Sequence, residues 1–198
     1  MKIGLTGSIA CGKSTVSSFL REIGYTVVDA DAISHSLTAP GGGALSAIRE
    51  AFGDGVFRGS ELDRRALGSA VFSDREKRAQ LNAILHPMIL ARIYDDLDRH
   101  DTPDTLVFAD VPLLYECGMA DRFDRIWVVS AQEDTQLERL MARDSLTREE
   151  ALARIRSQMP LEEKRRRADA VIHTDGPIPE TQQQVRRLLA APRQRRQA

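Results

Sequence analysis

The sequence predicts an α/β fold in which a parallel sheet is covered by helices. Short apolar segments that suit buried strands alternate with longer segments of helical periodicity, as expected when helices connect parallel strands. A glycine-containing loop joins the first strand segment to the first helical one, and a long stretch without strand signals interrupts the alternation. With 198 residues, the chain is long enough to bury a sizeable hydrophobic core.

The N-terminal part of the chain shows a strand–helix–strand pattern. Residues 2–6 form an apolar run that predicts a buried first strand, and 25–29 form a second strand of β-branched type. Between them, a loop over 7–14 leads into a predicted helix over 14–23, which Gly24 ends. The apolar face of this helix consists of Val16, Phe19, Leu20 and Ile23.

The middle of the chain, 30–100, predicts helices and turns but no convincing strand. Pro40–Gly43 marks a break. Asp63 and Asp74 are suited to cap the helices that follow them, and Pro87 is expected to start or kink a helix. We therefore expect a helical insertion in the α/β core.

Strand signals return in the second half of the chain. The arginine-rich stretch 132–167 is predicted to be helical, and Thr147 with Glu150 forms a capping box that starts a helix. A last helix is expected near 181–189, and the basic tail Arg193–Arg196 is interpreted as a solvated end. The strands predicted here are 105–110, 126–129 and 170–172.

The composition is that of an ordinary globular protein, with 42% apolar and 29% charged residues. The net charge of −1 gives no general attraction to nucleic acid or to an anionic membrane, so neither partner is expected. The two cysteines form no metal-ligand spacing and no disulfide framework, which favours a reducing compartment. Without a signal peptide or a long apolar run, the expected location is the cytoplasm.

The loop Gly7–Ser14 fits the phosphate-binding motif G-x-x-x-x-G-K-[ST], the P-loop. Glycines let its backbone curl so that N–H groups point at phosphate oxygens, and the following helix adds the positive end of its dipole. Lys13 is expected to reach the β- and γ-phosphates of ATP, and the Ser14 hydroxyl to ligate Mg²⁺. A chance glycine loop would lack the preceding strand and the following amphipathic helix. The expected nucleotide-binding residues are Gly7, Ala10, Cys11, Gly12, Lys13, Ser14 and Thr15.

Three aspartates that follow predicted strands are candidates for chemistry at the phosphates. Asp29 and Asp31 come at the end of the second strand, and open α/β sheets bind ligands beyond the carboxyl ends of their strands. For Asp31, the alternative to a role in chemistry is an N-cap plus a solvated acid. Asp110 ends a later strand and is suited to hold Mg²⁺ through water, with a strand-end cap as the alternative.

Segments spread over most of the chain resemble the dephospho-CoA kinase family. The loop at 7–15 is shared with many nucleotide-binding proteins, but the ordered set Asp-Ala-Asp, His-Pro and Pro-Leu-Leu-Tyr-Glu is specific to this family. Besides the loop, the matching pieces, which include this ordered set, are Val-Asp-Ala-Asp-Ala-Ile (28–33), Leu-His-Pro (85–87), Asp-Val-Pro-Leu-Leu-Tyr-Glu (110–116), Gln-Leu-Glu-Arg-Leu-Met-Ala-Arg-Asp (136–144), Gln158 and Ala-Asp-Ala-Val-Ile (168–172).

The resemblance implies that ATP phosphorylates the ribose 3′-hydroxyl of dephospho-CoA, giving CoA and ADP in the last step of coenzyme A biosynthesis. It implies a general base at Asp31 and lid arginines at Arg139 and Arg143, which act with Lys13 of the loop. The acceptor-binding residues that it implies are Asp31, His86, Leu113, Leu114 and Glu116.

The resemblance also implies a single P-loop nucleotide-kinase domain over 1–198 with three parts. The core is expected at about 1–30, 104–131 and 168–192, the helical substrate region at about 31–103, and the lid at about 136–167.

Several of these residues have a plainer alternative. Arg139 and Arg143 are four residues apart and share one helix face, but solvated helix charges would show the same spacing. His86, beside Pro87, would equally suit a structural histidine at a helix start. The basic run Lys164–Arg167 is interpreted as a solvated face and not as a ligand site.

The chain departs from the family pattern at the nucleotide. The family usually has glycines where Ser8 and Ala10 stand, a serine at Cys11 and an asparagine at His173, which leaves the loop's flexibility and the adenine contact open. A thiol among inward N–H groups at a helix start predicts a lowered pKa for Cys11 and inhibition by oxidised glutathione. The alternative is that Cys11 is simply a small loop residue.

Two other functions fit the loop. One is a kinase for another small molecule or nucleoside, with a different acceptor region. The other is a nucleotide-binding regulator without an acceptor, which would need neither a general base nor lid arginines.

Overall fold

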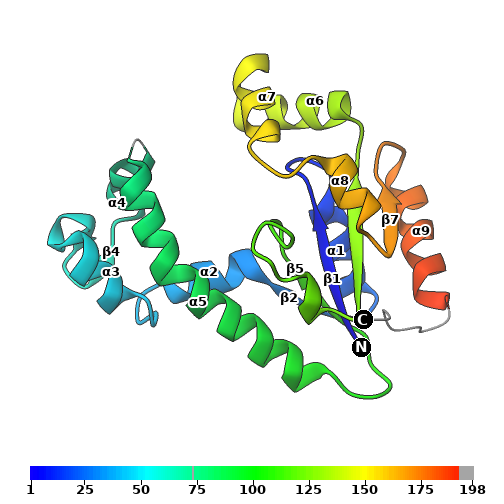
Figure 1. Ribbon diagram of the computed structural model, residues 1–198, viewed down its shortest axis with the longest axis horizontal. Helices are drawn as coiled ribbons and strands as arrows, with labels where there is room; N and C mark the ends of the chain where they lie inside the picture. The colour runs from blue at the N-terminus through cyan, green and yellow to red at the C-terminus, as the bar shows by residue number, and fades with distance from the viewer. Residues whose placement is uncertain (73, 192–198) are drawn as a thin grey trace. The chain divides into compact units, whose positions relative to one another are not determined.

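The computed structural model describes residues 1–72 and 74–191 and contains a five-stranded sheet flanked by helices (Figure 1). The spatial order of the strands is β2-β5-β1-β6-β7, and the pairs β1–β5, β1–β6 and β6–β7 are parallel. The predicted α/β class with a parallel sheet is therefore confirmed. The strands are β1 (Lys2–Gly7), β2 (Thr26–Asp29), β5 (Val107–Asp110), β6 (Arg125–Ser130) and β7 (Ala170–His173).

The chain forms two compact units. We call Met1–Val28 with the described residues from Arg99 onward the sheet unit, and Asp29–Asp98 the helical unit. A 3₁₀ turn, η2 (Ala120–Arg122), precedes β6. The helices of the sheet unit are α1 (Lys13–Glu22), α6 (Glu133–Asp144), α7 (Arg148–Arg156), α8 (Leu161–Arg166) and α9 (Ile178–Ala190).

Two helices, α1 and α9, cover one face of the sheet. Leu20 of α1 and Val185 of α9 are fully buried in one hydrophobic cluster with Leu5 of β1, Phe108 of β5 and Trp127 of β6. The Phe108 ring meets the Trp127 ring edge-on at 5.2 Å between centroids. Burial of these large apolar side chains stabilises the packing of α1 and α9 against the sheet.

The helical unit corrects the expectation that its part of the chain contains no strand. The strands β3 (Phe57–Arg58) and β4 (Glu61–Leu62) pair as an antiparallel hairpin. Each strand has two residues, which is too short for an alternating pattern to show in the sequence. The helices of the helical unit are α2 (Ala30–Leu37), α3 (Leu45–Phe52), α4 (Arg64–Phe72) and α5 (Arg75–His100), and a 3₁₀ turn, η1 (Asp54–Val56), follows α3.

The predicted helix caps are confirmed. Asp63 Oδ1 accepts the N–H groups of Arg65 and Ala66, and Asp74 Oδ1 does the same at the start of α5. Pro87 does not start a helix, because α5 begins at Arg75 and continues through it.

The sheet unit also confirms the predicted capping box. Thr147 Oγ1 accepts the N–H of Glu150 at 3.3 Å, and Glu150 Oε2 accepts the N–H of Thr147 at 2.9 Å. The basic tail Arg193–Arg196 and residue 192 lie outside the described residues. Within the described parts of the chain, no helix combines the length and apolarity needed to cross a membrane.

Candidate active site

The P-loop follows β1 directly and ends where α1 begins at Lys13. Gly12 has a φ of +80°, and a Cβ there would lie 3.1 Å from Thr174 Oγ1, so both conformation and space favour glycine. A Cβ on Gly7 would lie 2.6 Å from the Val129 carbonyl oxygen, so this position also excludes a side chain. The two glycines of the motif are thus explained by the packing of the loop against β6 and Thr174.

Ala10 also takes a left-handed conformation, with a φ of +58°. A glycine would adopt this conformation without strain. In this chain Ile9 and Ala10 pack against the small apolar cluster formed by Leu137, Leu140 and Ala151 of α6 and α7. The alanine therefore adds an apolar contact between the loop and the α6–α7 helices.

The expected low pKa of Cys11 is wrong. The side chain is 1% exposed, and desolvation by burial raises the pKa of its thiol to about 11, although the neighbouring N–H of Lys13 and the lysine charge act in the opposite direction. A buried, protonated thiol is a poor nucleophile, so the alternative holds and Cys11 is a small loop residue.

Lys13 and Asp110 form an ion pair beside the loop. Lys13 is the first residue of α1 and Asp110 the last residue of β5, the strand that pairs with β1. Their side chains are 15% and 7% exposed, which makes this one of the least solvated ion pairs among the described residues. The structure thus brings together the lysine and the carboxylate that the sequence assigned to phosphates and metal.

A cavity of about 330 Å³ opens beside the loop. It joins the start of α1 to one face of α6 and to the segment after β7. The residues that line it are Ala10, Gly12, Ser14, Thr15, Arg139, Arg143, Thr174, Gly176, Ile178 and Thr181. Both predicted lid arginines and four predicted nucleotide-binding residues therefore share one cavity.

The two arginines of α6 are held differently. Arg139 donates to the Thr174 carbonyl oxygen at 2.6 Å and to Thr174 Oγ1 at 3.2 Å, so its guanidinium is fixed against the segment that supports the P-loop. Arg143 pairs with the adjacent Asp144 at 2.8 Å and leaves 58% of its side chain exposed. The hydrogen bond between them raises the pKa of Arg143 and lowers that of Asp144.

Asp29, and not Asp31, caps α2. Asp29 Oδ1 accepts the N–H groups of Asp31 and Ala32, each at 3.0 Å. Asp31 lies in the first turn of α2 and is exposed. A capping aspartate with an exposed acid in the first helical turn is the arrangement that the alternative for Asp31 describes, and the exposed carboxylate is also accessible for a role as a base.

The residues expected on the acceptor side have distinct surroundings. His86 is an exposed residue inside α5, so it is not a helix-start histidine. Leu113 is 39% exposed, whereas Leu114 is fully buried, and a Cβ on Gly4 would lie 2.5 Å from Leu114 Cδ1. Glu116 Oε1 forms an ion pair with Lys164 Nζ at 2.8 Å.

Lys164 corrects the interpretation of 164–167 as a solvated face. Its side chain is 0% exposed, whereas the three arginines that follow it are exposed. A run of four basic residues suggests uniform solvation, but one position in each helical turn of α8 faces the protein interior.

Sequence reasoning missed Thr174 as a support of the site. Its hydroxyl lies 2.7 Å from the Cys11 carbonyl oxygen and also contacts Arg139, so it links the P-loop to α6. The contact joins residues 163 positions apart, and no local pattern marks it. The nearest signal was its place two residues after the predicted strand 170–172.

The donor set beside the loop suits Mg²⁺ that arrives with a nucleotide. The Ser14 hydroxyl and the Asp110 carboxylate are oxygen ligands of the kind that Mg²⁺ prefers, and Mg²⁺ is usually bound by one or two such groups together with phosphates and waters. Within 1–72 and 74–191, the structure contains no group of three or more side chains suited to hold a metal by themselves.

Comparison with solved structures supports the class of protein. A protein from Thermus thermophilus is 40% identical, with a TM-score of 0.79 and coverage of 96% of both chains. The dephospho-CoA kinase from Campylobacter jejuni is 27% identical, with a TM-score of 0.69 and coverage of 95% of both chains. The fold and the site define an ATP-dependent phosphotransferase of the P-loop kinase class.

Comparison of sequences identifies the family. The family model described as "Dephospho-CoA kinase" matches residues 1–180. The dephospho-CoA kinase of Carboxydothermus hydrogenoformans is 45% identical over 190 residues, which cover 94% of this chain and 92% of the relative. The chain belongs to the dephospho-CoA kinase family, which acts in coenzyme A biosynthesis.

Proposed function

We propose that the chain transfers the γ-phosphoryl group of ATP to the ribose 3′-hydroxyl of dephospho-CoA, giving ADP and CoA. The observation that carries this proposal is the single cavity shared by the P-loop and the two arginines of α6. Family membership supplies the acceptor. Phosphoryl transfer needs little covalent chemistry from the protein and depends on positioning and on stabilising negative charge. The glycine loop and the two arginines around this cavity support such a role.

Lys13 is proposed to stabilise the phosphates during transfer. Its ammonium comes from the end of the loop whose N–H groups receive the phosphates, and Asp110 holds it in the free protein. When ATP binds, the phosphate oxygens give the ammonium a second set of acceptors. The charge that develops between the β- and γ-phosphates is stabilised by a group that is already in place.

Ser14 and Asp110 are proposed to hold Mg²⁺ together with the ATP phosphates. The ion supplies positive charge to the phosphate oxygens. Ser14 is exposed at the start of α1 and lines the cavity, so its hydroxyl is accessible to an ion that binds with the phosphates.

Arg139 and Arg143 are proposed to contact the phosphates from the α6 side of the cavity. Arg143 is the more adaptable of the two, because its partner Asp144 is a neighbour on its own helix. We propose that residues 136–167 act as a lid in this sense, with α6 presenting its arginines to the transferred group. Closure of such lids excludes water from the transferred phosphoryl group.

Asp31 is proposed as the general base for the acceptor hydroxyl. A ribose hydroxyl is a weak acid, so its proton must leave as the bond to phosphorus forms, and an exposed carboxylate can accept it. The support is the Asp-Ala-Asp match to the family and the exposure of Asp31 in the first turn of α2.

The helical region 31–103, with His86, and the 112–116 stretch are proposed to bind dephospho-CoA. Leu113 and Glu116 offer exposed surface for contact, whereas Leu114 contributes through packing against Gly4. Gly176 and Ile178 are proposed to lie beside the adenine, because they line the same cavity and come from the segment after β7, not from the P-loop.

An acceptor panel tests the proposed function. ADP release is measured with purified protein, ATP and Mg²⁺, with dephospho-CoA, nucleosides, shikimate or water as the acceptor. We expect release with dephospho-CoA to exceed release with water by at least about 10³-fold, which is modest for an enzyme. Faster turnover with another acceptor would indicate a different kinase, and tight ATP binding with no stimulation by any acceptor would indicate a regulator.

A further inference from the structure

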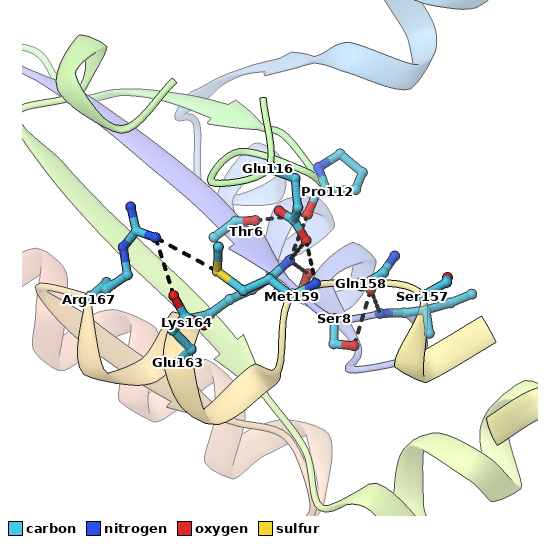
Figure 2. A network of polar contacts seen from close by, with 12 residues as sticks. Thr6, Ser8, Pro112, Glu116, Ser157, Gln158, Met159, Glu163, Lys164 and Arg167 are labelled. Atoms are coloured by element: carbon cyan, nitrogen blue, oxygen red, sulfur yellow. Dashed lines mark hydrogen bonds and ion pairs between the residues drawn. The ribbon is translucent and has the colours of Figure 1, made fainter. Parts of the chain in front are cut away.

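The linker that follows α7 passes beside the P-loop and then enters α8. Within residues 158–164 of this linker and helix, Gln158 contacts the loop, Met159 contacts the 112–116 stretch and Lys164 contacts both. Figure 2 shows this network from close by. All the groups concerned belong to the sheet unit. We call these residues the 158–164 segment.

Lys164 is the buried end of this segment. Its Nζ lies 2.8 Å from Glu116 Oε1, 3.2 Å from the Gly7 carbonyl oxygen and 3.4 Å from the Pro112 carbonyl oxygen (Figure 2). An ammonium has three N–H donors, so these three acceptors match its full capacity. Lys164 thereby joins the first residue of the P-loop to two residues of the 112–116 stretch.

Gln158 is the other end of the segment. Its Oε1 accepts the N–H of Ile9 at 2.8 Å and the Ser8 hydroxyl at 3.2 Å (Figure 2). With Lys164 on the Gly7 carbonyl, the segment holds three successive loop residues. Between the two ends, the N–H of Met159 donates to Glu116 Oε1 at 3.1 Å, which ties the segment to the 112–116 stretch a second time.

The energetics of this arrangement favour a role in geometry over one in stability alone. Burial of a lysine is costly, and a well-packed apolar pair in place of a buried ion pair is often neutral or stabilising. An apolar pair has no N–H donor, so it could not hold the Gly7 and Pro112 carbonyl oxygens at hydrogen-bond distance from one group. A loop fixed in this way before ATP arrives loses less conformational freedom on binding.

We propose that Gln158 and Lys164 are positioning residues for phosphoryl transfer, acting through the P-loop and the 112–116 stretch. Gln158 orders only the loop. Lys164 orders the loop together with the stretch that is proposed to bind the acceptor. The inference rests on the proposed function for the identity of the two substrates.

Gln158→Met tests the contact with the loop, because methionine keeps the length of the side chain and removes the acceptor. We expect the Kd for ATP, measured by calorimetry, to rise about five- to tenfold, the effect of one or two lost hydrogen bonds. The KM for dephospho-CoA should remain within twofold of wild type. Ser157→Ala is the matched control, since the Ser157 hydroxyl donates to the Arg154 carbonyl of its own helix and not to the loop.

Lys164→Met tests the contact with both sides. We expect the Kd for ATP and the KM for dephospho-CoA both to rise at least fivefold. We also expect kcat to fall about 10- to 100-fold, because misplaced reacting groups reach the transition state less often. Arg166→Met, an exposed position on the same helix, should behave as wild type. If Lys164→Met does not fold, the double variant Lys164→Met/Glu116→Leu is used, because it removes both charges of the ion pair. Its Kd for ATP should also rise at least fivefold.

The outcomes separate positioning from a purely structural role. A purely structural role predicts a lowered Tm with ATP binding unchanged in whatever folds. Folded Gln158→Met with a Kd for ATP within twofold of wild type would overturn the inference for Gln158, and the same result for the Lys164 variant would overturn it for Lys164. Because the primary readout is ATP binding, failure of the proposed function would show separately, as wild-type protein that binds ATP but does not phosphorylate dephospho-CoA.

Discussion

The P-loop and the α6 helix both line one cavity and both carry cationic side chains, but they hold these side chains in different ways. Lys13 pairs with Asp110, and both side chains are nearly buried. Arg143 pairs with Asp144 at the surface, where more than half of its side chain is exposed. Arg139 is intermediate, because it is fixed by Thr174, a residue that also holds the loop.

This difference suggests a division of labour. A buried pair in a poorly solvated site keeps one geometry, whereas an exposed ion pair is weak and exchanges partners readily. Under the proposed function, the loop would therefore provide a fixed phosphate site, and α6 would provide charge that can move onto the bound group. Substitutions at the loop, at the base and at α6 should either break this distinction or sharpen it.

Lys13→Ala should have the largest effect. It removes the one ammonium of the loop, and we expect kcat to fall about 10³-fold, because preorganised charge contributes more to catalysis than most other effects. Circular dichroism and Tm should show a folded protein, since the fold depends on the apolar cores. Turnover near that of wild type in the folded variant would show that the loop lysine is not needed for transfer.

Asp31→Asn should have the second largest effect on kcat. The amide keeps the size of the side chain and removes its basicity, and we expect a loss of about 10²-fold in kcat with dephospho-CoA while the Kd for ATP stays unchanged. Asp29→Asn is the matched comparison, because asparagine is also a good helix cap and should preserve α2. If Asp29→Asn were inactive and Asp31→Asn nearly normal, the base would have been assigned to the wrong carboxylate.

The two arginines of α6 should separate activity from stability. Arg143→Ala should lower kcat about tenfold with little change in Tm, because its pairing with Asp144 is exposed. Arg139→Ala should lower kcat and also lower Tm by roughly 5 °C, because it removes charged hydrogen bonds to Thr174. Equal thermal shifts in the two variants would contradict the distinction between a fixed and an adaptable arginine.

The smallest effect is expected on thermal stability, from the protonation of Asp144 at low pH. Its hydrogen bond with Arg143 lowers the pKa of Asp144 from the ordinary value of 3.8, so the unfolded chain takes up the proton first. The stabilising contribution is fully present above pH 3.8 and is lost as the pH falls through the lowered pKa of the folded state. The Tm difference between wild type and Asp144→Asn should be constant from neutral pH to about pH 5 and shrink below about pH 4.

That pH profile has a matched control in the capping box. Glu150 also has a pKa lowered by hydrogen bonds, there from Thr147, so Glu150→Gln should show a profile of the same sign. A Tm difference for Asp144→Asn that grew on acidification would mean that the carboxylate opposes folding.

The sequence predicts the elements that depend on neighbouring residues. The strands, the aspartate caps, the capping box and the two fixed glycines follow from local pattern and conformation, and the structure confirms them. The hairpin at 57–62 was missed because each of its strands has two residues. Burial reversed two other expectations: desolvation raises the pKa of Cys11, and the interior position of Lys164 hides it within a basic run.

The candidate site shows the same limit. The motif gives Gly7, Gly12, Lys13 and Ser14, because a phosphate loop is a local structure. The partners that hold the loop, Thr174 and Lys164, come from segments more than 150 residues away in the chain. Which side chains reach back to the loop depends on the order of strands in the sheet, and no local pattern encodes it.

Transfer of labelled phosphate tests the central claim most directly. Wild-type protein is incubated with ATP labelled at the γ-phosphate, Mg²⁺ and dephospho-CoA, and the product is separated and analysed by ³¹P NMR. We expect one equivalent of label in CoA, as a monoester on the ribose 3′-oxygen, for each ADP released. Folded Lys13→Ala should form this product about 10³-fold more slowly. Label found only in inorganic phosphate, or on another position of the acceptor, would contradict the proposed function.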